Sequence, residues 1–179
     1  MIKVEIRRPK IKDQEELHLF FRDVINDTFA KEGIGHLTND IEEEIETKKS
    51  YLQNDYESDG QNQYFLIATY DETIVGTIEY GPASSLICKN TNDIFCDVVE
   101  VGTVFVHPNY QGNGIGNMLL QSIYITLKEK DIKEFCIDSG YKNAQKIWKN
   151  KFGSPDFVIK DYWGEGLDHM IWRVNVTKF

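Results

Sequence analysis

The sequence predicts an α/β fold of the α+β type, in which helices flank one mixed, mostly antiparallel sheet. Three observations favour this class. The chain has 179 residues, a usual length for one domain, so a single domain over residues 1–179 is expected. Hydrophobic residues make up 41% and charged residues 27% of the chain, which is typical of a globular protein. Segments with strand character alternate with segments of helical periodicity in the order β-α-α-β-β-β-α-β-α-β-β.

The first half of the chain is expected to contain a strand, two helices and a hairpin. Branched residues favour a strand over 2–7, which ends before Pro9. A helix is predicted to begin near Asp13, because apolar residues recur there at three-and-four spacing. These residues are Leu17, Phe20, Phe21, Val24, Ile25 and Phe29. A second helix follows the break at 33–36, with Thr38 or Asn39 as its cap. Strands over 64–70 and 73–81, joined by two turn residues, indicate a hairpin.

The second half of the chain is expected to alternate strands and helices. Residues 82–92 show no clear period and are predicted to form a loop, followed by a long strand over 98–106. A glycine-rich segment then leads into a helix whose apolar residues are Ile115, Leu119, Ile123 and Leu127. A short strand over 135–138 and a helix over 143–151 come next. Two strands, over 156–163 and 169–176, close the chain around the turn 164–168.

Composition argues against nucleic-acid and membrane partners. The formal net charge is −9, and this field repels phosphate backbones and anionic headgroups. The amino terminus lacks the apolar region of a signal peptide, and no stretch approaches the roughly 18 apolar residues that cross a bilayer.

The cysteines and histidines indicate neither disulfides nor a metal site. Cys88, Cys96 and Cys136 are an odd number without CxxC spacing, so the sequence favours free thiols in a reducing cytoplasm. His36 and His169 have no matching ligand spacing, so no metal is expected.

The segment over 101–120 carries the most functional information. A strand, a proline turn and Gly112, Gly114 and Gly116 precede an apolar helix. Such a loop can direct backbone N–H groups at phosphate oxygens, and the positive end of the helix dipole favours negative charge there. The spacing is not that of the Rossmann motif, and no Walker lysine follows it.

This segment resembles the phosphate-binding motif [QR]-x-x-G-x-[GA] of the GNAT acyl-CoA N-acyltransferases, and the predicted order of elements is similar to theirs. The resemblance implies one N-acetyltransferase domain with acetyl-CoA as co-substrate. It implies that the pantetheine and thioester carbonyl lie along Val104, Phe105 and Val106, and that Asn143 binds the pantetheine arm. The implied phosphate loop comprises Gln111, Gly112, Asn113, Gly114, Ile115, Gly116 and Asn117. Many relatives carry Arg or Lys where this loop has Gly112 and Asn113, so backbone donors must supply most of the binding.

The resemblance also suggests acid and base residues. Amine acetylation needs a neutral nucleophile, so a base must deprotonate an ammonium whose pKa is near 10.4. Glu100 matches the general base of the histone acetyltransferase branch, although it could equally be a structural glutamate. Trp148 falls where many relatives have a tyrosine acid, so either the thiolate leaves unaided or Tyr110, Tyr141 or Tyr162 protonates it.

The resulting hypothesis is an N-acetyltransferase that transfers an acetyl group from acetyl-CoA to a primary amine by direct attack in a ternary complex. The amine acceptor is a small molecule or a peptide, and a homodimer is conceivable through exchange of the carboxy-terminal hairpin. Two alternatives remain open. One is a non-catalytic acyl-CoA sensor, and the other is a protein-interaction module that docks a basic tail on the acidic segment 40–59.

Overall fold

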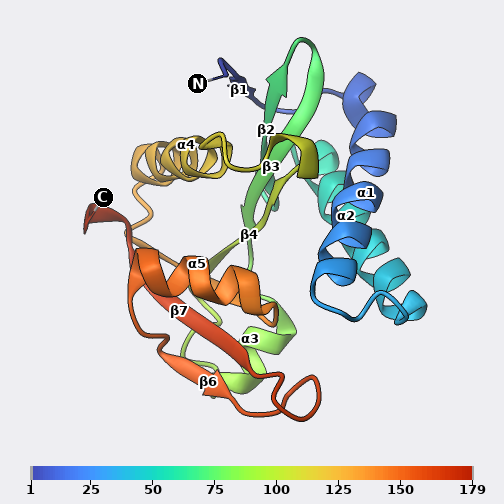
Figure 1. The fold of residues 1–179 in the computed structure, drawn as a ribbon. Helices are drawn as coiled ribbons and strands as arrows, with labels where there is room; N and C mark the ends of the chain where they lie inside the picture. The colour runs from blue at the N-terminus through green and yellow to red at the C-terminus, as the bar shows by residue number, and fades with distance from the viewer. Residues whose placement is uncertain (1, 179) are drawn as a thin grey trace. The chain divides into compact units, whose positions relative to one another are not determined.

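The computed structural model describes residues 2–178 and contains a seven-stranded mixed sheet with helices on its faces (Figure 1). The hydrogen-bonded strands follow the order β1-β2-β3-β4-β5-β7-β6. The pairings β1–β2, β2–β3, β5–β7 and β6–β7 are antiparallel, whereas β4 and β5 run parallel. The predicted fold class, a mostly antiparallel sheet flanked by helices, is therefore confirmed.

The elements follow the predicted order with one addition, the helix α3. The strands are β1 (Glu5–Arg7), β2 (Tyr64–Tyr70), β3 (Thr73–Gly81), β4 (Val99–Val106), β5 (Glu134–Ser139), β6 (Phe157–Ile159) and β7 (His169–Asn175). The α-helices are α1 (Gln14–Lys31), α2 (Thr38–Ser58), α3 (Ser85–Asn90), α4 (Ile115–Glu129) and α5 (Lys142–Phe152). Short 3-10 turns lie at Ile11–Asp13, Pro108–Tyr110 and Val176–Lys178.

The chain forms two compact units, and β4 contributes to both. The first unit contains the residues up to Tyr80 and Thr103–Thr126, and the second contains Gly81–Gly102 and the residues from Leu127. Both units are therefore discontinuous in the sequence.

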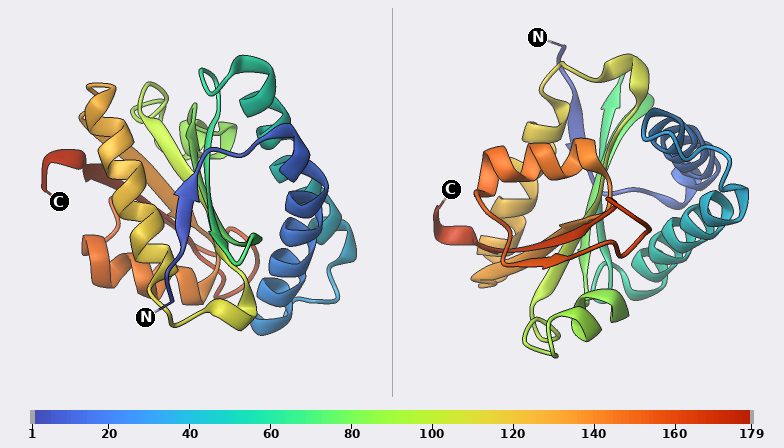
Figure 2. Two further views of the ribbon diagram at one scale, coloured as in Figure 1. Left: turned by 90° about the horizontal axis from the view of Figure 1, so that it is seen from above. Right: turned by 60° about the horizontal axis from the view of Figure 1, so that its bottom comes forward.

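In the first unit, helices cover both faces of the sheet. The strands β2 and β3 lie between α4 on one side and the paired helices α1 and α2 on the other (Figure 2). Phe21 of α1 packs against Phe65 and Phe105, with ring centroids 6.2 and 6.5 Å apart. The apolar face predicted for this helix is buried, since Leu17, Phe20, Phe21, Val24, Ile25 and Phe29 are each at most 5% exposed.

In the second unit, α3 and α5 pack around the β5–β7–β6 strands. Its core cluster consists of Ile87, Phe95, Val98, Cys136 and Ile171. The indole N–H of Trp172, which is 1% exposed, donates to the Gly153 carbonyl just after α5, at 2.9 Å. This bond ties the end of α5 to the middle of β7.

Residues 82–92 are not the loop that the sequence predicts. Ser84 caps α3 by accepting a hydrogen bond from the Ile87 N–H at 3.4 Å, and Ile87 is fully buried. Six helical residues carry too few apolar positions to show a period, which explains the error.

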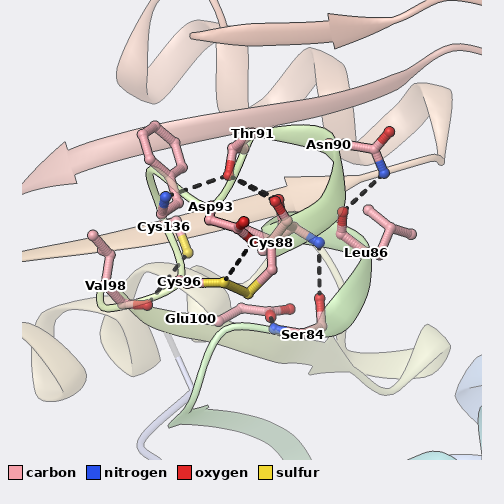
Figure 3. The surroundings of a disulfide bond; sticks show 12 residues. Ser84, Leu86, Cys88, Asn90, Thr91, Asp93, Cys96, Val98, Glu100 and Cys136 are labelled. Carbon is pink, nitrogen blue, oxygen red and sulfur yellow. Dashed lines mark hydrogen bonds between the residues drawn. A yellow bond between two sulfur atoms is a disulfide. The ribbon is translucent and has the colours of Figure 1, made fainter.

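The expectation of three free thiols is also wrong, because Cys88 and Cys96 form a disulfide (Figure 3). The turn after α3 reverses the chain and brings the two Cα atoms to 4.9 Å, a proximity that sequence spacing does not reveal. Cys136 is the free cysteine, and it is buried.

The remaining differences concern the ends of elements. The first strand is β1 alone, residues 5–7, and the strand expected over 156–163 shortens to β6. The second helix begins at Thr38, so Leu37 occupies the capping position and neither Thr38 nor Asn39 is its cap. Within residues 2–178, no helix is both long and apolar enough to cross a membrane.

The ion pair of Arg7 and Asp13 predicts a pH-dependent stability. Arg7 donates to both carboxylate oxygens of Asp13, at 2.7 and 3.0 Å, and the Lys10 N–H donates to the same group at 2.7 Å. The hydrogen bond from Arg7, with that from Lys10, holds the pKa of Asp13 below its usual value. Asp13 therefore stabilises the fold above its unfolded pKa of about 3.9, and this contribution disappears as pH falls through its lower folded pKa.

Asp13→Asn should accordingly lower the free energy of unfolding at pH 7 by about 1–2 kcal/mol. The difference from the parent protein should shrink as the pH is lowered from about 5 towards 2. Urea denaturation at several pH values measures this, with Glu15→Gln, an exposed change in the first turn of α1, as the control. An Asp13→Asn difference that is constant with pH would contradict the assignment.

Candidate functional site

The carboxyl-terminal half of β4 contains a left-handed residue. Thr103 has a φ of +49°, although it lies within a strand and its side chain is branched at Cβ. Such a conformation costs on the order of 1–3 kcal/mol and persists only where neighbouring contacts enforce it. The residues that follow are Val104, Phe105 and Val106, which are partly exposed, as candidates for ligand contact must be.

The glycine loop follows this strand directly. Gly112 and Gly114 both have a φ of +79°, and a Cβ at either position would have no heavy atom within 4 Å. Both glycines are therefore required by backbone conformation, and the space beside them is open. At the start of α4, the N–H groups of Ile115 and Gly116 have no acceptor within the helix and are oriented along its axis.

Side chains of the loop fasten it to its surroundings. The Gln111 amide donates to the Val106 carbonyl at 3.1 Å, so the predicted strand and loop are brought together. The Lys31 ammonium donates to the Gln111 side-chain oxygen at 3.3 Å and also pairs with Asp27 at 2.6 Å, so its charge is compensated within α1. Asn113 donates to the Tyr110 carbonyl at 3.0 Å, and the Asn117 N–H to the Gly114 carbonyl at 3.1 Å.

Close packing fixes the position of α4 against β3. A Cβ on Gly76 would lie 3.0 Å from side-chain atoms of both Ile115 and Leu119 and 3.2 Å from the Phe105 carbonyl. A larger residue at this position would displace either the first turn of α4 or the strand β4. The geometry of the loop therefore depends on Gly76 of β3, which lies far from it in the sequence.

Glu100, the predicted base, lies at the start of β4 in the second unit. Its carboxylate accepts a hydrogen bond from the Ser84 N–H at 2.7 Å (Figure 3). It pairs in register with Cys136 of β5, and burial together with the nearby Glu100 charge raises the pKa of that thiol. Cys136 is thus kept protonated and unreactive.

The other residues predicted in the second unit have different degrees of exposure. Tyr141 precedes α5, and its N–H donates to the Ser139 hydroxyl at 2.9 Å. Tyr162 is 41% exposed, with its ring 4.8 Å from that of Trp163. Asn143 is exposed in the first turn of α5. Trp148 is 6% exposed and stacks on Phe152, so it belongs to the core.

Sequence reasoning missed the polar side chains that surround Thr103. Glu79 of β3 is only 3% exposed and accepts a hydrogen bond from the Thr103 hydroxyl at 3.1 Å. The fully buried Thr77 donates to the Thr103 carbonyl at 2.9 Å. One signal was available, since Glu79 is the single charged residue of the segment 73–81. Among the described residues, no group of three or more His, Cys, Asp or Glu side chains is arranged to hold a metal ion.

Comparison with known proteins confirms the resemblance that the glycine loop suggests. The sequence profile of the Acetyltransferase (GNAT) family matches residues 27–153, more than half of the chain. No curated protein sequence matches the chain.

Similar folds occur among solved structures. A protein from Desulfovibrio desulfuricans described as an acetyltransferase of the GNAT family has a TM-score of 0.74 at 18% identity, covering 97% of this chain and 99% of its own. PaiA N-acetyltransferase from Thermoplasma acidophilum, in complex with coenzyme A, has a TM-score of 0.69 at 21% identity, covering 97% and 99%. The yncA protein of Salmonella typhimurium, with acetyl-CoA, has a TM-score of 0.69 at 17% identity, covering 97% and 94%.

At these identities the solved structures establish a likeness of fold, while the profile match establishes the family. Members of this family are acyl-CoA-dependent N-acyltransferases, and two of the similar structures were determined with CoA or acetyl-CoA. On the matched residues, which include the glycine loop and β4, this chain belongs to the Acetyltransferase (GNAT) family.

Proposed function

We propose that the protein is a single-domain N-acetyltransferase that transfers an acetyl group from acetyl-CoA to a primary amine. The observation that carries this proposal is the connected unit of β4, the glycine loop and α4, which lies within the family match. Its open glycines and the N–H groups at the start of α4 suit a pyrophosphate. The residues proposed to hold CoA are Val104, Phe105, Val106, Gln111, Gly112, Asn113, Gly114, Ile115, Gly116, Asn117 and Asn143.

The proposed reaction is direct attack in a ternary complex. Acetyl-CoA supplies an acyl group that is activated as a thioester. Glu100 takes a proton from the substrate ammonium, and the neutral nitrogen then forms a bond to the carbonyl carbon while the carbon–sulfur bond breaks. The nitrogen releases its second proton to solvent as the neutral amide forms. A backbone N–H of the segment Val104–Val106 stabilises the negative charge that develops on the carbonyl oxygen.

The leaving thiolate receives a proton from Tyr141 or Tyr162, or leaves unaided because thiols ionise near pH 8.5. Trp148 takes no part, since it is buried against Phe152. The presence of Trp148 where many relatives have a tyrosine acid is the observation that favours a second candidate, a non-catalytic acyl-CoA sensor.

One experiment separates these candidates. Acetyl-CoA binding is measured by calorimetry, and thiol release is measured with a panel of small amines and peptides with free amino termini. Binding with thiol release on at least one amine supports the transferase. Binding without release on any amine supports the sensor, and a lack of binding refutes both.

The loop glycines give a more specific prediction. Gly114→Ala forces a residue with a Cβ to adopt a φ of +79° or to move the loop, so acetyl-CoA affinity should fall about tenfold or more. Gly33→Ala is a matched control, because Gly33 has a φ of +78° and equally open surroundings but lies between α1 and α2. Calorimetric titration of both variants should reveal a loss in Gly114→Ala alone, and equal affinities would contradict the role of the loop.

We further propose a cytoplasmic location, a small-molecule or peptide acceptor, no nucleic-acid or membrane partner, and a homodimer whose mass light scattering would reveal. The Cys88–Cys96 disulfide bears on the location, because disulfides are rare in reducing compartments. Thiol titration of the unfolded, unreduced protein should count one thiol, that of Cys136, if the disulfide forms in the cell. A count of three would favour the reducing cytoplasm.

A further inference from the structure

A strained residue must be held by its surroundings, and Thr103 is such a residue. Its φ of +49° lies in the left-handed region, which branched side chains rarely adopt. The strand continues beyond it to Val106, where the Gln111 amide binds the carbonyl, and the next N–H, that of His107, donates to the Val75 carbonyl at 3.0 Å. The far end of the segment 103–107 is therefore fixed, and the course of its backbone depends on Thr103.

Two side chains of β3 hold Thr103 from the same strand. The Thr77 hydroxyl donates to its carbonyl at 2.9 Å, and the Glu79 carboxylate accepts from its hydroxyl at 3.1 Å. The other Glu79 oxygen accepts from the Gln63 amide at 2.9 Å, which fixes the orientation of the carboxylate. The carbonyl and the hydroxyl of Thr103 are thus both hydrogen-bonded to side chains of β3.

The residues of this hydrogen-bond network are almost completely buried. Thr77 is 0%, Glu79 3%, Thr103 5% and Gln63 6% exposed. Burying a carboxylate is unfavourable unless hydrogen bonds compensate for the lost hydration, and an apolar residue would fill a strand core more cheaply. A glutamate at this position is therefore best explained by the bond that it makes to Thr103.

We propose that Glu79 and Thr77 are positioning residues of the acyl-CoA site. They hold Thr103 in its left-handed conformation, so that Val104, Phe105 and Val106 offer their backbone groups to the pantetheine and thioester in one fixed orientation. This inference rests on the proposed function, because it assigns a purpose to the segment that is proposed to bind acyl-CoA. Neither residue touches the reacting atoms in this scheme.

The test introduces Glu79→Leu into the parent protein and into a Thr103→Gly variant, and it introduces Glu79→Gln into the parent protein. Glu79→Leu removes the acceptor, whereas Glu79→Gln keeps an oxygen for the Thr103 hydroxyl. A glycine at position 103 adopts a positive φ without strain, so in the Thr103→Gly variant the hydrogen bonds to Thr77 and Glu79 are no longer needed to hold the backbone. Acetyl-CoA affinity is measured by calorimetry, and amide hydrogen exchange of residues 104–106 is measured without ligand. Thr69→Val, at a buried position of β2, controls for loss of a threonine hydroxyl elsewhere in the first unit.

We expect Glu79→Leu to weaken acetyl-CoA binding about tenfold and to accelerate exchange at residues 104–106 to a similar extent. Glu79→Gln and Thr69→Val should resemble the parent protein. In the Thr103→Gly background, Glu79→Leu should add less than about a threefold loss, because no strain is left to hold.

Two results would overturn the inference. One is an equal loss from Glu79→Leu in both backgrounds, and the other is a Glu79→Gln variant as impaired as Glu79→Leu. A parent protein that fails to bind acetyl-CoA would refute the proposed function. In that case, unchanged amide exchange in Glu79→Leu would also refute the role of Glu79 in holding Thr103. Faster exchange would instead show that Glu79 constrains the backbone of β4 without any link to acyl-CoA binding.

Discussion

Replacing Glu100 by glutamine should lower kcat by at least about a hundredfold while acetyl-CoA affinity stays unchanged. A carboxylate can accept the proton of the attacking amine, whereas an amide cannot. The amide oxygen of glutamine can still accept the Ser84 N–H bond, which is 2.7 Å long in the parent protein. The start of α3 should therefore remain in place, and the loss of turnover can be attributed to proton transfer.

Thiol release and calorimetric binding measure this prediction once an accepted amine is known. Glu129→Gln makes the same chemical change at an exposed position at the end of α4 and should leave turnover within about twofold of the parent. Undiminished turnover in Glu100→Gln would refute the role of Glu100 as the base.

Asp55→Ala should lower the free energy of unfolding by about 2–3 kcal/mol. Asp55 is fully buried at the end of α2, where it accepts from Arg8 at 2.8 Å and from the Phe65 N–H at 2.7 Å. The Arg8 guanidinium also lies 4.4 Å from the centre of the Tyr64 ring. Removing the carboxylate would leave the Phe65 N–H buried without its acceptor, and the Arg8 side chain, which is 32% exposed, without its ion-pair partner.

Burial raises the pKa of Asp55 despite the opposing effect of its hydrogen-bond donors, so dehydration of this charge is substantial. The Phe65 N–H would be left buried without an acceptor, whereas Arg8 would keep part of its hydration because its side chain is 32% exposed. Urea denaturation measures the loss. Glu57→Ala, an exposed change on the same helix, should alter stability by less than about 0.5 kcal/mol. A comparable loss in both variants would contradict the argument.

Much of the fold could be predicted because its signals are local. The hairpin turn consists of Asp71 and Glu72, both with positive φ, as a two-residue connection requires. The glycine loop combines a strand, positive-φ glycines and an apolar helix within 20 residues, so its place and its expected ligand could be inferred together.

The features that escaped prediction depend on contacts between distant residues. Thr103 has a positive φ although its neighbour Gly102 could adopt one without strain, and Thr103 is the residue that Thr77 and Glu79 bind. The Cys88–Cys96 disulfide likewise depends on how the chain turns after α3. Glu79 is a charged residue in a strand that is buried on both faces, so the sequence shows its presence but no alternation of polar and apolar residues shows which partner it faces.

The passage of β4 through both units has a consequence for biosynthesis. The first unit ends at Thr126, although its first 80 residues emerge from the ribosome long before. Between these points the nascent chain exposes β3 without the strand that completes its pairing and without α4, which covers Gly76. A strand edge that stays unpaired during synthesis is a site for aggregation. The first unit can therefore complete its folding only after β4, the glycine loop and α4 have been translated. The segment that is proposed to bind CoA is thus also the one whose synthesis pairs the exposed edge of β3.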